Sequence, residues 1–315
     1  MAFLPVSGTF LDGISCDIPS NNWTPDVWER EFARYQANGI NEAYIIRTGW
    51  GDSMMFDSKV MKCTLCPEMD MVQLFLDLGN KYNVRIYMGL FDTRKFWPRN
   101  DWENEVAVNI DLIHELNGRY GKHPAFCGWY MSHEGSMCYH QTQIWKPLCQ
   151  EIKKFDKERP IMVSPRYAGK KWSSEYPITP EVHAKHFDYI LNEMEGLIDA
   201  YAPMDGHVPF NELEGFMAAM AEVLEKYGAQ YWSNLETFDR DMPYKFPPIE
   251  FAKLKCKLEI AEKYCSKIIS FELPHFMSPD SCYPAAGHLY NRYLAYAAAR
   301  RLQKNDPVHS VKTKV

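Results

Sequence analysis

The sequence lacks any apolar run that reaches the roughly 18 residues needed for a membrane helix. It also lacks a basic excess, because 35 Lys and Arg residues stand against 41 Asp and Glu, and the net charge of -6 argues against a nucleic-acid partner. The N-terminus, MAFLPVSGTFLDG, has no basic segment before a long apolar core, so no signal peptide is expected. Together with nine cysteines, an odd number, these absences predict a cytoplasmic protein with reduced thiols.

Two further absences concern cofactors. No glycine-rich phosphate-binding turn follows the first predicted strand, where the chain reads LDGISCDIPSNNW, although doubly wound nucleotide-binding sheets normally carry one. Cys63 and Cys66 form a single C-x-x-C pair, but a structural zinc site needs four ligands and no second pair stands at matching spacing. We therefore expect no cofactor and no metal site.

The hydrophobic pattern alternates between short buried segments and longer amphipathic segments. The short segments predict strands at 8–14, 42–47, 84–91, 126–131, 161–164, 197–202, 229–234 and 267–273. The longer segments predict helices at about 25–38, 67–82, 101–120, 141–156, 180–194, 210–227, 248–264 and 285–302. The first helix shows the clearest signals, with Thr24 as N-cap, Pro25 in the first turn and Gly39 after its end.

Eight strand–helix units in 315 residues predict an α/β protein with a single (β/α)8 TIM barrel, a fold that typically takes about 250 residues plus insertions. We assign residues 1–303 to this barrel as the catalytic domain and 304–315 to a polar C-terminal tail. Active sites of such barrels lie at the C-terminal ends of the strands, so polar residues directly after a strand are the candidates for function.

Aromatic residues make up 14% of the chain, and many of them stand beside carboxylates at the predicted strand ends. Carboxylates among aromatic side chains suit a small carbohydrate, because apolar faces of a sugar ring stack on aromatic rings and its hydroxyls need charged acceptors. The predicted substrate-binding residues are Asp12, Arg47, Trp50, Asp92, Trp97, Trp129, His133, Arg166, Tyr167, Asp205, His207, Trp232, Asn234, Glu272 and His275.

Glu134 and Glu236 are the predicted catalytic pair, because they follow strands four and seven. Hydrolysis of a glycosidic bond needs one carboxyl group to protonate the leaving oxygen and a second to attack the anomeric carbon or activate water. This layout resembles the large superfamily of retaining barrel glycosidases, whose acid/base follows strand four and whose nucleophile follows strand seven. That superfamily usually has Asn before the acid/base, where this chain has His133.

A closer resemblance covers nearly the whole chain. The strings SGTFLDGISCDIPSNNW, GWYMSHE, APMDGH, ETFDRDMPYKF and FELPHFMSP resemble domain of unknown function 4434, a family of uncharacterised bacterial barrels related to glycoside hydrolases. That family usually has Gln where this chain has Met204, and often Gly where it has His133. The resemblance implies a barrel and carbohydrate chemistry, and it supplies no substrate.

Some of these residues also have structural interpretations. Asp205-Gly206 is a common turn pair, and Glu272 lies inside a strand pattern, where a buried charge needs a partner such as Arg47 or Arg166. Either Asp205 or Glu272 could replace Glu236 as the second carboxylate.

The leading function is hydrolysis of a small oligosaccharide or glycoside with retention. Retention predicts a carboxyl separation of about 5–5.5 Å, and inversion one of about 6.5–9.5 Å. One alternative is a metal-dependent isomerase or aldolase acting on a sugar, with ligands drawn from Glu134, Asp205, His207, Glu236 and His275. Another is a non-catalytic carbohydrate-binding barrel. The sequence leaves open the sugar, the linkage, the anomer and whether the chain forms a homo-oligomer.

Overall fold

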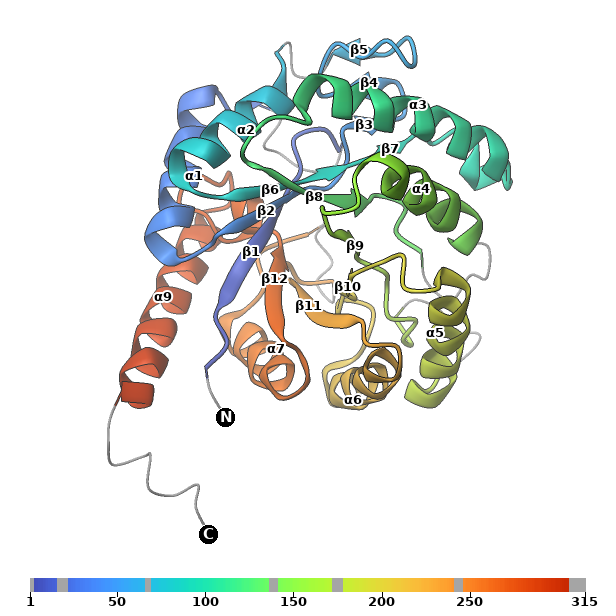
Figure 1. Ribbon diagram of the computed structural model, residues 1–315. Coiled ribbons are helices and arrows are strands. Elements are labelled where there is room, and N and C mark those ends of the chain that lie inside the picture. The colour runs from blue at the N-terminus through green and yellow to red at the C-terminus, as the bar shows by residue number, and fades with distance from the viewer. Residues whose placement is uncertain are drawn as a thin grey trace.

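Eight parallel strands close into a barrel in the computed structural model (Figure 1), which confirms the predicted (β/α)8 architecture. The structure describes residues 3–15, 22–65, 69–135, 141–171, 178–240 and 246–305. The barrel strands, in the order in which they neighbour one another, are β1 (Val6–Leu11), β2 (Glu42–Ile45), β6 (Arg85–Gly89), β8 (Phe126–Met131), β9 (Ile161–Val163), β10 (Ala200–Tyr201), β11 (Gln230–Glu236) and β12 (Lys267–Phe271).

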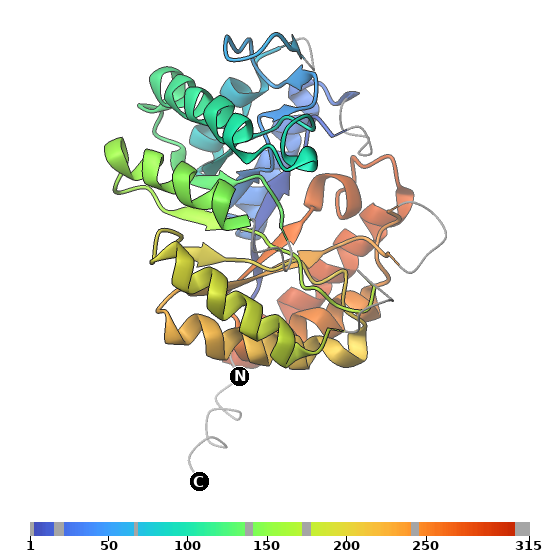
Figure 2. The same ribbon diagram turned by 90° about the vertical axis from the view of Figure 1, so that its right-hand side faces the viewer.

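Helices surround the barrel on its outside (Figure 2). They are α1 (Pro25–Asn38), α2 (Met71–Tyr82), α3 (Trp102–Tyr120), α4 (Gln141–Phe155), α5 (Pro180–Met194), α6 (Phe210–Lys226), α7 (Phe251–Tyr264), the short α8 (Leu273–Phe276) and α9 (Pro284–Asn305), with one 3-10 turn, η2 (Trp97–Arg99). None of the helices in the described part of the chain combines the length and the apolar character needed to span a bilayer.

The boundaries of the first helix lie where they were expected. Thr24 precedes α1 with extended backbone, although its side chain makes no capping hydrogen bond. Pro25 stands in the first turn, and Gly39 ends the helix in the left-handed conformation at φ 78°. The predicted start of the second helix near residue 67 lies outside the described residues. α2 begins at Met71, because the side chain of Asp70 accepts a hydrogen bond from the backbone N–H of Gln73 at 2.8 Å.

A small second sheet stands at the C-terminal end of the barrel (Figure 1). The segment after β2 forms β3 (Gly49–Trp50), β4 (Ser53–Met54) and β5 (Thr64–Leu65), and the segment after β6 forms β7 (Phe91–Asp92). β3 and β7 pair in parallel with Trp50 opposite Asp92. The short strands were not predicted from the sequence, and they hold two predicted site residues side by side.

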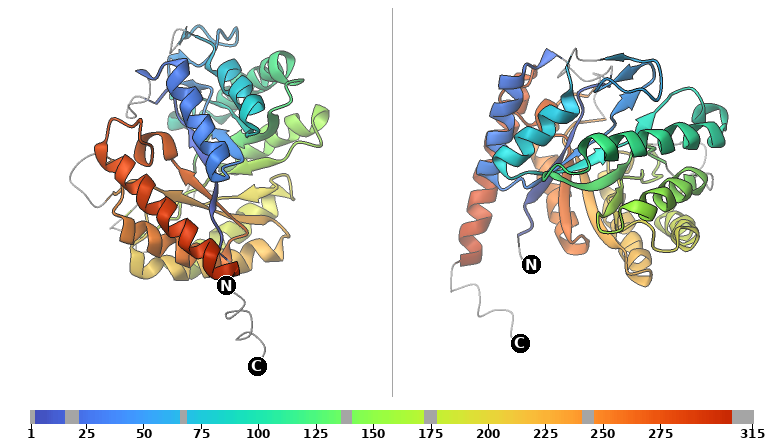
Figure 3. Two further views of the ribbon diagram at one scale, coloured as in Figure 1. Left: turned by 90° about the vertical axis from the view of Figure 1, so that its left-hand side faces the viewer. Right: turned by 45° about the horizontal axis from the view of Figure 1, so that its top comes forward.

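The last helix packs against the first strand and the first helix of the chain. α9 runs along the same side of the barrel as α1 (Figure 3), and Asn38 donates a hydrogen bond to the hydroxyl of Tyr290 at 2.7 Å. The hydroxyl of Tyr293 accepts from the backbone N–H of Val6 in β1 at 2.9 Å. α9 is longer than predicted and enters the segment assigned to the tail, while residues 306–315 lie outside the described part.

Aromatic rings fill the inside of the barrel. Phe10, Tyr44, Tyr87 and Tyr130 are buried there, and neighbouring ring centroids lie 4.7 to 5.4 Å apart. Offset and edge-on aromatic pairs at such distances pack well and add stability beyond the buried area. A large part of the aromatic excess therefore packs the barrel interior, whereas the sequence had suggested rings at the rim.

Candidate active site

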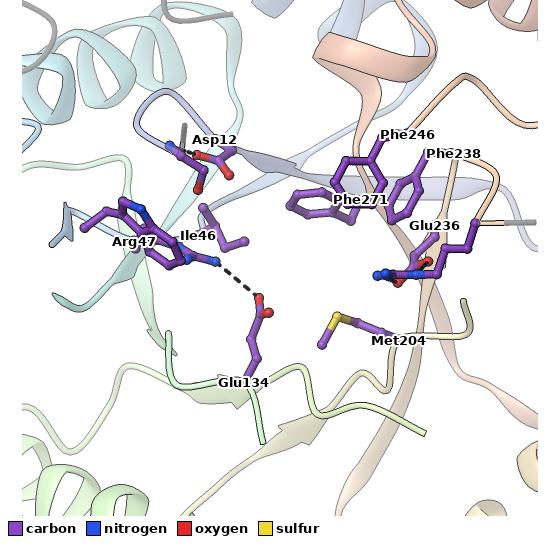
Figure 4. A pocket seen from close by; sticks show the side chains of 12 residues that line it. Asp12, Ile46, Arg47, Glu134, Met204, Glu236, Phe238, Phe246 and Phe271 are labelled. Atoms are coloured by element: carbon purple, nitrogen blue, oxygen red, sulfur yellow. Dashed lines mark hydrogen bonds and ion pairs between the residues drawn. The ribbon is translucent and has the colours of Figure 1, made fainter. Parts of the chain in front are cut away.

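A cavity of about 180 Å³ lies at the C-terminal ends of the barrel strands (Figure 4). Glu134 and Glu236 both line it, and they come from different walls, after β8 and at the end of β11. The other lining residues are Asp12, Ser15, Ile46, Arg47, Trp50, Met204, Phe238, Arg240, Phe246 and Phe271. The cavity thus joins three acidic groups, two arginines and an apolar wall.

Glu236 is held as a carboxylate by a partner four residues further along the chain. Its side chain is 1% exposed, and Arg240 donates to both of its oxygens, at 2.7 and 2.8 Å. Burial alone would favour the neutral acid, but the charge and the hydrogen bonds of Arg240 lower the pKa of Glu236 below its ordinary value. This carboxylate stays ionised at neutral pH.

The Asp205-Gly206 turn supports Glu236 from behind. Asp205 is buried, and its Oδ1 accepts from the backbone N–H of Glu236 at 3.1 Å and from Lys257 at 2.7 Å. Lys257 also donates to the backbone carbonyl of Glu236 at 3.0 Å. A Cβ atom at Gly206 would lie 1.6 Å from Oε2 of Glu236, so only glycine leaves room for the carboxylate. The turn is therefore a support for Glu236, and Asp205 does not line the main cavity.

Replacing Lys257 by methionine should lower the free energy of unfolding by about 3–5 kcal/mol, because it leaves the buried Asp205 carboxylate without its cation. Urea denaturation followed by circular dichroism measures the change. Lys255→Met on the same helix is the matched control, since the Lys255 side chain is 46% exposed, and it should change stability by less than about 0.5 kcal/mol. Equal losses in both variants would contradict the assigned role of the buried pair.

Glu134 lies in a setting that favours its protonated form. Its side chain is 17% exposed, and the hydroxyl of Tyr130 donates to Oε1 at 3.2 Å. Burial raises the pKa of Glu134, and the charges of Arg47 and Arg166 only partly oppose this. The two glutamates of the cavity therefore have pKa values displaced in opposite directions, which is how environment separates an acid from a base.

Arg47 and Trp50 form the wall next to Glu134. The guanidinium of Arg47 lies over the Trp50 ring at 4.1 Å, and Arg94 lies 4.8 Å from the same ring. Asp92 stands 4.0 Å from Arg47, and its Oδ1 accepts from the indole N–H of Trp97 at 2.8 Å. Of these predicted substrate-binding residues, Trp50 lines the cavity with two arginines over its ring, whereas Asp92 and Trp97 bind each other outside the cavity lining.

Asp12 lines the cavity, whereas Glu272 and His275 do not. Asp12 Oδ1 accepts from the backbone N–H of Ser15 at 2.9 Å. Glu272 accepts from the backbone N–H of Asp12 at 3.1 Å and pairs with His275, and both of these side chains are buried. Glu272 contacts His275, whereas the sequence had suggested Arg47 or Arg166 as one possible partner.

Three aromatic predictions are wrong for reasons of geometry. Trp129 is fully buried outside the barrel wall and donates to Asp156 at 2.8 Å. Tyr167 also lies outside the wall, where it binds the hydroxyl of Tyr231 and packs on the helices. Trp232 faces the barrel interior but pairs with Lys267 at the start of β12, so it lies at the opposite end of the barrel from the cavity.

Two other predicted residues bind neighbours within the scaffold. His133 is fully buried, and its Nε2 lies 2.7 Å from Glu105 Oε1, so it anchors the end of β8 to α3 directly before Glu134. Asn234 donates to the hydroxyl of Ser164 at 2.8 Å inside the barrel. Neither residue lines the main cavity.

Arg166 and His207 stand near the carboxylates without lining the cavity. Arg166 acts on Glu134 through its charge. Burial and the nearby Arg240 lower the pKa of His207 to about 4, so this imidazole is neutral at physiological pH. Both residues therefore contribute to the electrostatics around the cavity.

Several residues that line the cavity from loops were not identified from the sequence. Arg240 was not selected, although its spacing of four residues from Glu236 is one that often allows a contact. Phe238, Phe246 and Phe271 form the apolar wall, and none of the three was among the predicted site residues. Tyr130 could have been found from alternation along β8, since it points inward where Trp129 points outward.

The residues proposed for a metal alternative do not converge. Glu236 is bound to Arg240, Asp205 to Lys257, and His275 to Glu272. Within the described ranges, no group of three or more His, Cys, Asp and Glu side chains is arranged to hold a metal ion. Cys66 of the C-x-x-C pair lies outside those ranges.

Comparisons with known proteins match a protein family and a crystal structure. A family model described as domain of unknown function, DUF4434, matches residues 6–283. A crystal structure of a Bacteroides thetaiotaomicron protein described as a putative alpha-L-fucosidase shares 37% sequence identity and a TM-score of 0.89, over 93% of this chain and 95% of that one. No curated protein matches the chain.

More distant structures share the fold alone. Alpha-L-fucosidase isoenzyme 2 from Paenibacillus thiaminolyticus aligns with a TM-score of 0.56 at 11% identity, over 96% of this chain and 50% of that one. A family 1 β-glucosidase from Thermotoga maritima aligns with a TM-score of 0.52 at 8% identity, over 86% and 88% of the two chains. These likenesses are to barrels of the same architecture.

Proposed function

The chain belongs to the DUF4434 family, and we propose that this member is a glycoside hydrolase that acts with retention of anomeric configuration. One observation carries the proposal: two glutamates line the same cavity, with the pKa of Glu134 raised and that of Glu236 lowered. An acid and an ionised carboxylate at one cavity are the minimum that glycoside hydrolysis requires. The names of the structural neighbours, which are mostly glycosidases, agree with it.

The proposed reaction has two steps. In the first, Glu236 attacks the anomeric carbon while Glu134 gives its proton to the leaving oxygen, so the glycosidic bond breaks and a glycosyl ester forms on Glu236. In the second, Glu134 takes a proton from water, whose oxygen attacks the anomeric carbon and releases Glu236. The ion pair with Arg240 supports the role of Glu236 as the ionised nucleophile.

The size of the cavity favours a small substrate. Its volume of about 180 Å³ lies below the range of about 300–1,000 Å³ usual for drug-sized ligands. One sugar ring is therefore the proposed occupant next to the two glutamates. Because one relative is described as a putative alpha-L-fucosidase, fucosides belong among the first substrates to test. A cytoplasmic location stays a prediction of the sequence.

A screen of nitrophenyl glycosides tests the proposal, with α- and β-linked hexosides, fucosides and uronosides as substrates. We expect at least one of them to be cleaved, and proton NMR of the first product should show the anomeric configuration of the substrate. A product of the opposite configuration would contradict retention and assign Glu236 as a base. Saturable sugar binding without any turnover would favour the non-catalytic barrel instead.

A further inference from the structure

Arg47 is a buried cation whose hydrogen-bond donors are not used within the described structure. It is 7% exposed and lines the cavity, and its Nε has no hydrogen-bond partner. The nearest carboxylate oxygens, on Glu134 and Asp92, stand at 3.8 and 4.0 Å, beyond hydrogen-bond range. A buried guanidinium with five donors normally has acceptors for them, so this one is prepared for a ligand.

The orientation of Arg47 is fixed before any ligand arrives. Its planar group lies 4.1 Å from the centre of the Trp50 ring. Trp50 belongs to β3, which is paired with both β4 and β7. A guanidinium stacked on a tryptophan that is itself held in a sheet loses little freedom on binding, and its fork matches a planar carboxylate with two parallel hydrogen bonds.

Of the two arginines in the described lining of the cavity, Arg47 is the one whose donors remain available to a ligand. Arg240 donates to both oxygens of Glu236. Asp92 and Glu134 lie near Arg47 but beyond hydrogen-bond range, at 4.0 and 3.8 Å. A substrate carboxylate can therefore accept hydrogen bonds from Arg47 without displacing a protein partner.

From these observations we infer that the substrate is an anionic sugar, a hexuronic acid residue whose carboxylate binds in bidentate fashion to Arg47 beside Glu134. The inference rests on the proposed function, since it names the substrate class of the same cavity. Arg47 is then a specificity-determining residue that touches the substrate, and Trp50 holds it in place.

Binding of free sugars tests the inference without requiring turnover. Isothermal titration of the full chain should show glucuronate or galacturonate binding about 10- to 100-fold more tightly than the neutral hexose of the same configuration, as expected for hydrogen bonds between charged groups. Arg47→Met should abolish this preference. Arg47→Lys should keep part of it, because the charge remains but the fork is lost. Glucose 6-sulfate, a sugar with a tetrahedral anion, is titrated in the same way for comparison.

Arg94→Met is the matched control, because Arg94 approaches the same Trp50 ring but its side chain is 50% exposed and lies outside the cavity lining. It should leave the uronate preference unchanged. If Arg47→Met does not fold, the wild-type comparison of uronate with hexose still decides the question.

The outcomes separate the two proposals. Equal binding of uronate and hexose, or a preference that survives Arg47→Met, overturns the inference even if neutral glycosides are cleaved. Tighter binding of the sulfated sugar than of the uronate also overturns it, because it assigns a tetrahedral anion. An Arg47-dependent uronate preference in a protein that cleaves no glycoside supports the anionic subsite and contradicts the proposed hydrolase.

Discussion

Replacing Glu236 by glutamine should lower kcat/KM by about 10⁴-fold or more, as when one member of a catalytic unit is removed. Glutamine keeps the shape of the side chain but cannot form the glycosyl ester, and it leaves the guanidinium of Arg240 without its anion. Steady-state hydrolysis of the best nitrophenyl glycoside from the screen measures the loss. Mass spectrometry with a fluorinated glycoside should find the ester on Glu236 of the wild-type protein.

Glu103→Gln provides the control for this substitution. Glu103 stands in the first turn of α3, its side chain is exposed, and it does not line the cavity. This variant should hydrolyse the glycoside at the wild-type rate. A Glu236→Gln protein that is folded and retains more than a tenth of wild-type activity would remove Glu236 from the reaction and bring Asp12, the remaining acidic lining group, forward as second carboxylate.

Replacing Glu134 by glutamine should produce a loss that depends on the leaving group. An alkyl glycoside needs the proton of Glu134, so its kcat/KM should fall by about 10²–10⁴-fold. A dinitrophenyl glycoside leaves without protonation, so its kcat/KM should change little. Azide should accelerate turnover of the Glu134→Ala variant, because the shortened side chain leaves room for a small anion at the position of the missing carboxylate.

The pH profile gives an independent test of Glu134. In the wild type, activity should fall on the acid side as Glu236, whose pKa is lowered, becomes protonated. It should fall on the alkaline side as Glu134, whose pKa is raised, loses the proton that it must donate. In Glu134→Gln the alkaline fall should disappear for the dinitrophenyl glycoside. An alkaline limb that stays in place would assign it to another group.

The positions of the two glutamates were accessible from the sequence because strand ends dictate them. A strand that finishes before Glu134 and another that ends at Glu236 must deliver both to the same end of a parallel barrel. Hydrophobic periodicity identifies such strands even when their boundaries are uncertain. The fold, and the end of the barrel at which these two residues lie, therefore followed from local patterns.

The sequence predicted less reliably which face of a strand a side chain occupies and how far along the barrel axis it lies. Trp232, Asn234 and Glu236 all point into the barrel, but at about 3.3 Å per residue Trp232 lies about 13 Å below Glu236. Trp129 lies at the correct end of β8 but on the outer face. A one-residue error in the phase of a strand exchanges the two faces, which is why aromatic residues near strand ends were wrongly taken as a sugar platform.

Contacts between residues brought together by loops, or by elements far apart in the sequence, were the hardest to predict. Arg240 reaches Glu236 only because the chain turns back after β11, and Lys257 reaches Asp205 from the middle of α7. Neither contact has a signal in periodicity or composition. The opposite pKa displacements of the two glutamates depend on such neighbours and were not predicted from the sequence. Only the resemblance to retaining barrel glycosidases implied how the roles divide between them.

The absence of a side chain at Gly206 makes this position a marker for comparing relatives. The carboxylate of Glu236 lies where a Cβ atom would stand, so any larger residue would force Glu236 and Arg240 to move together. A relative that keeps Glu236 but carries alanine or a larger residue at this point must hold its carboxylate elsewhere. Surveying this one position should therefore separate relatives that retain this geometry from those that have abandoned it, before any of them is purified.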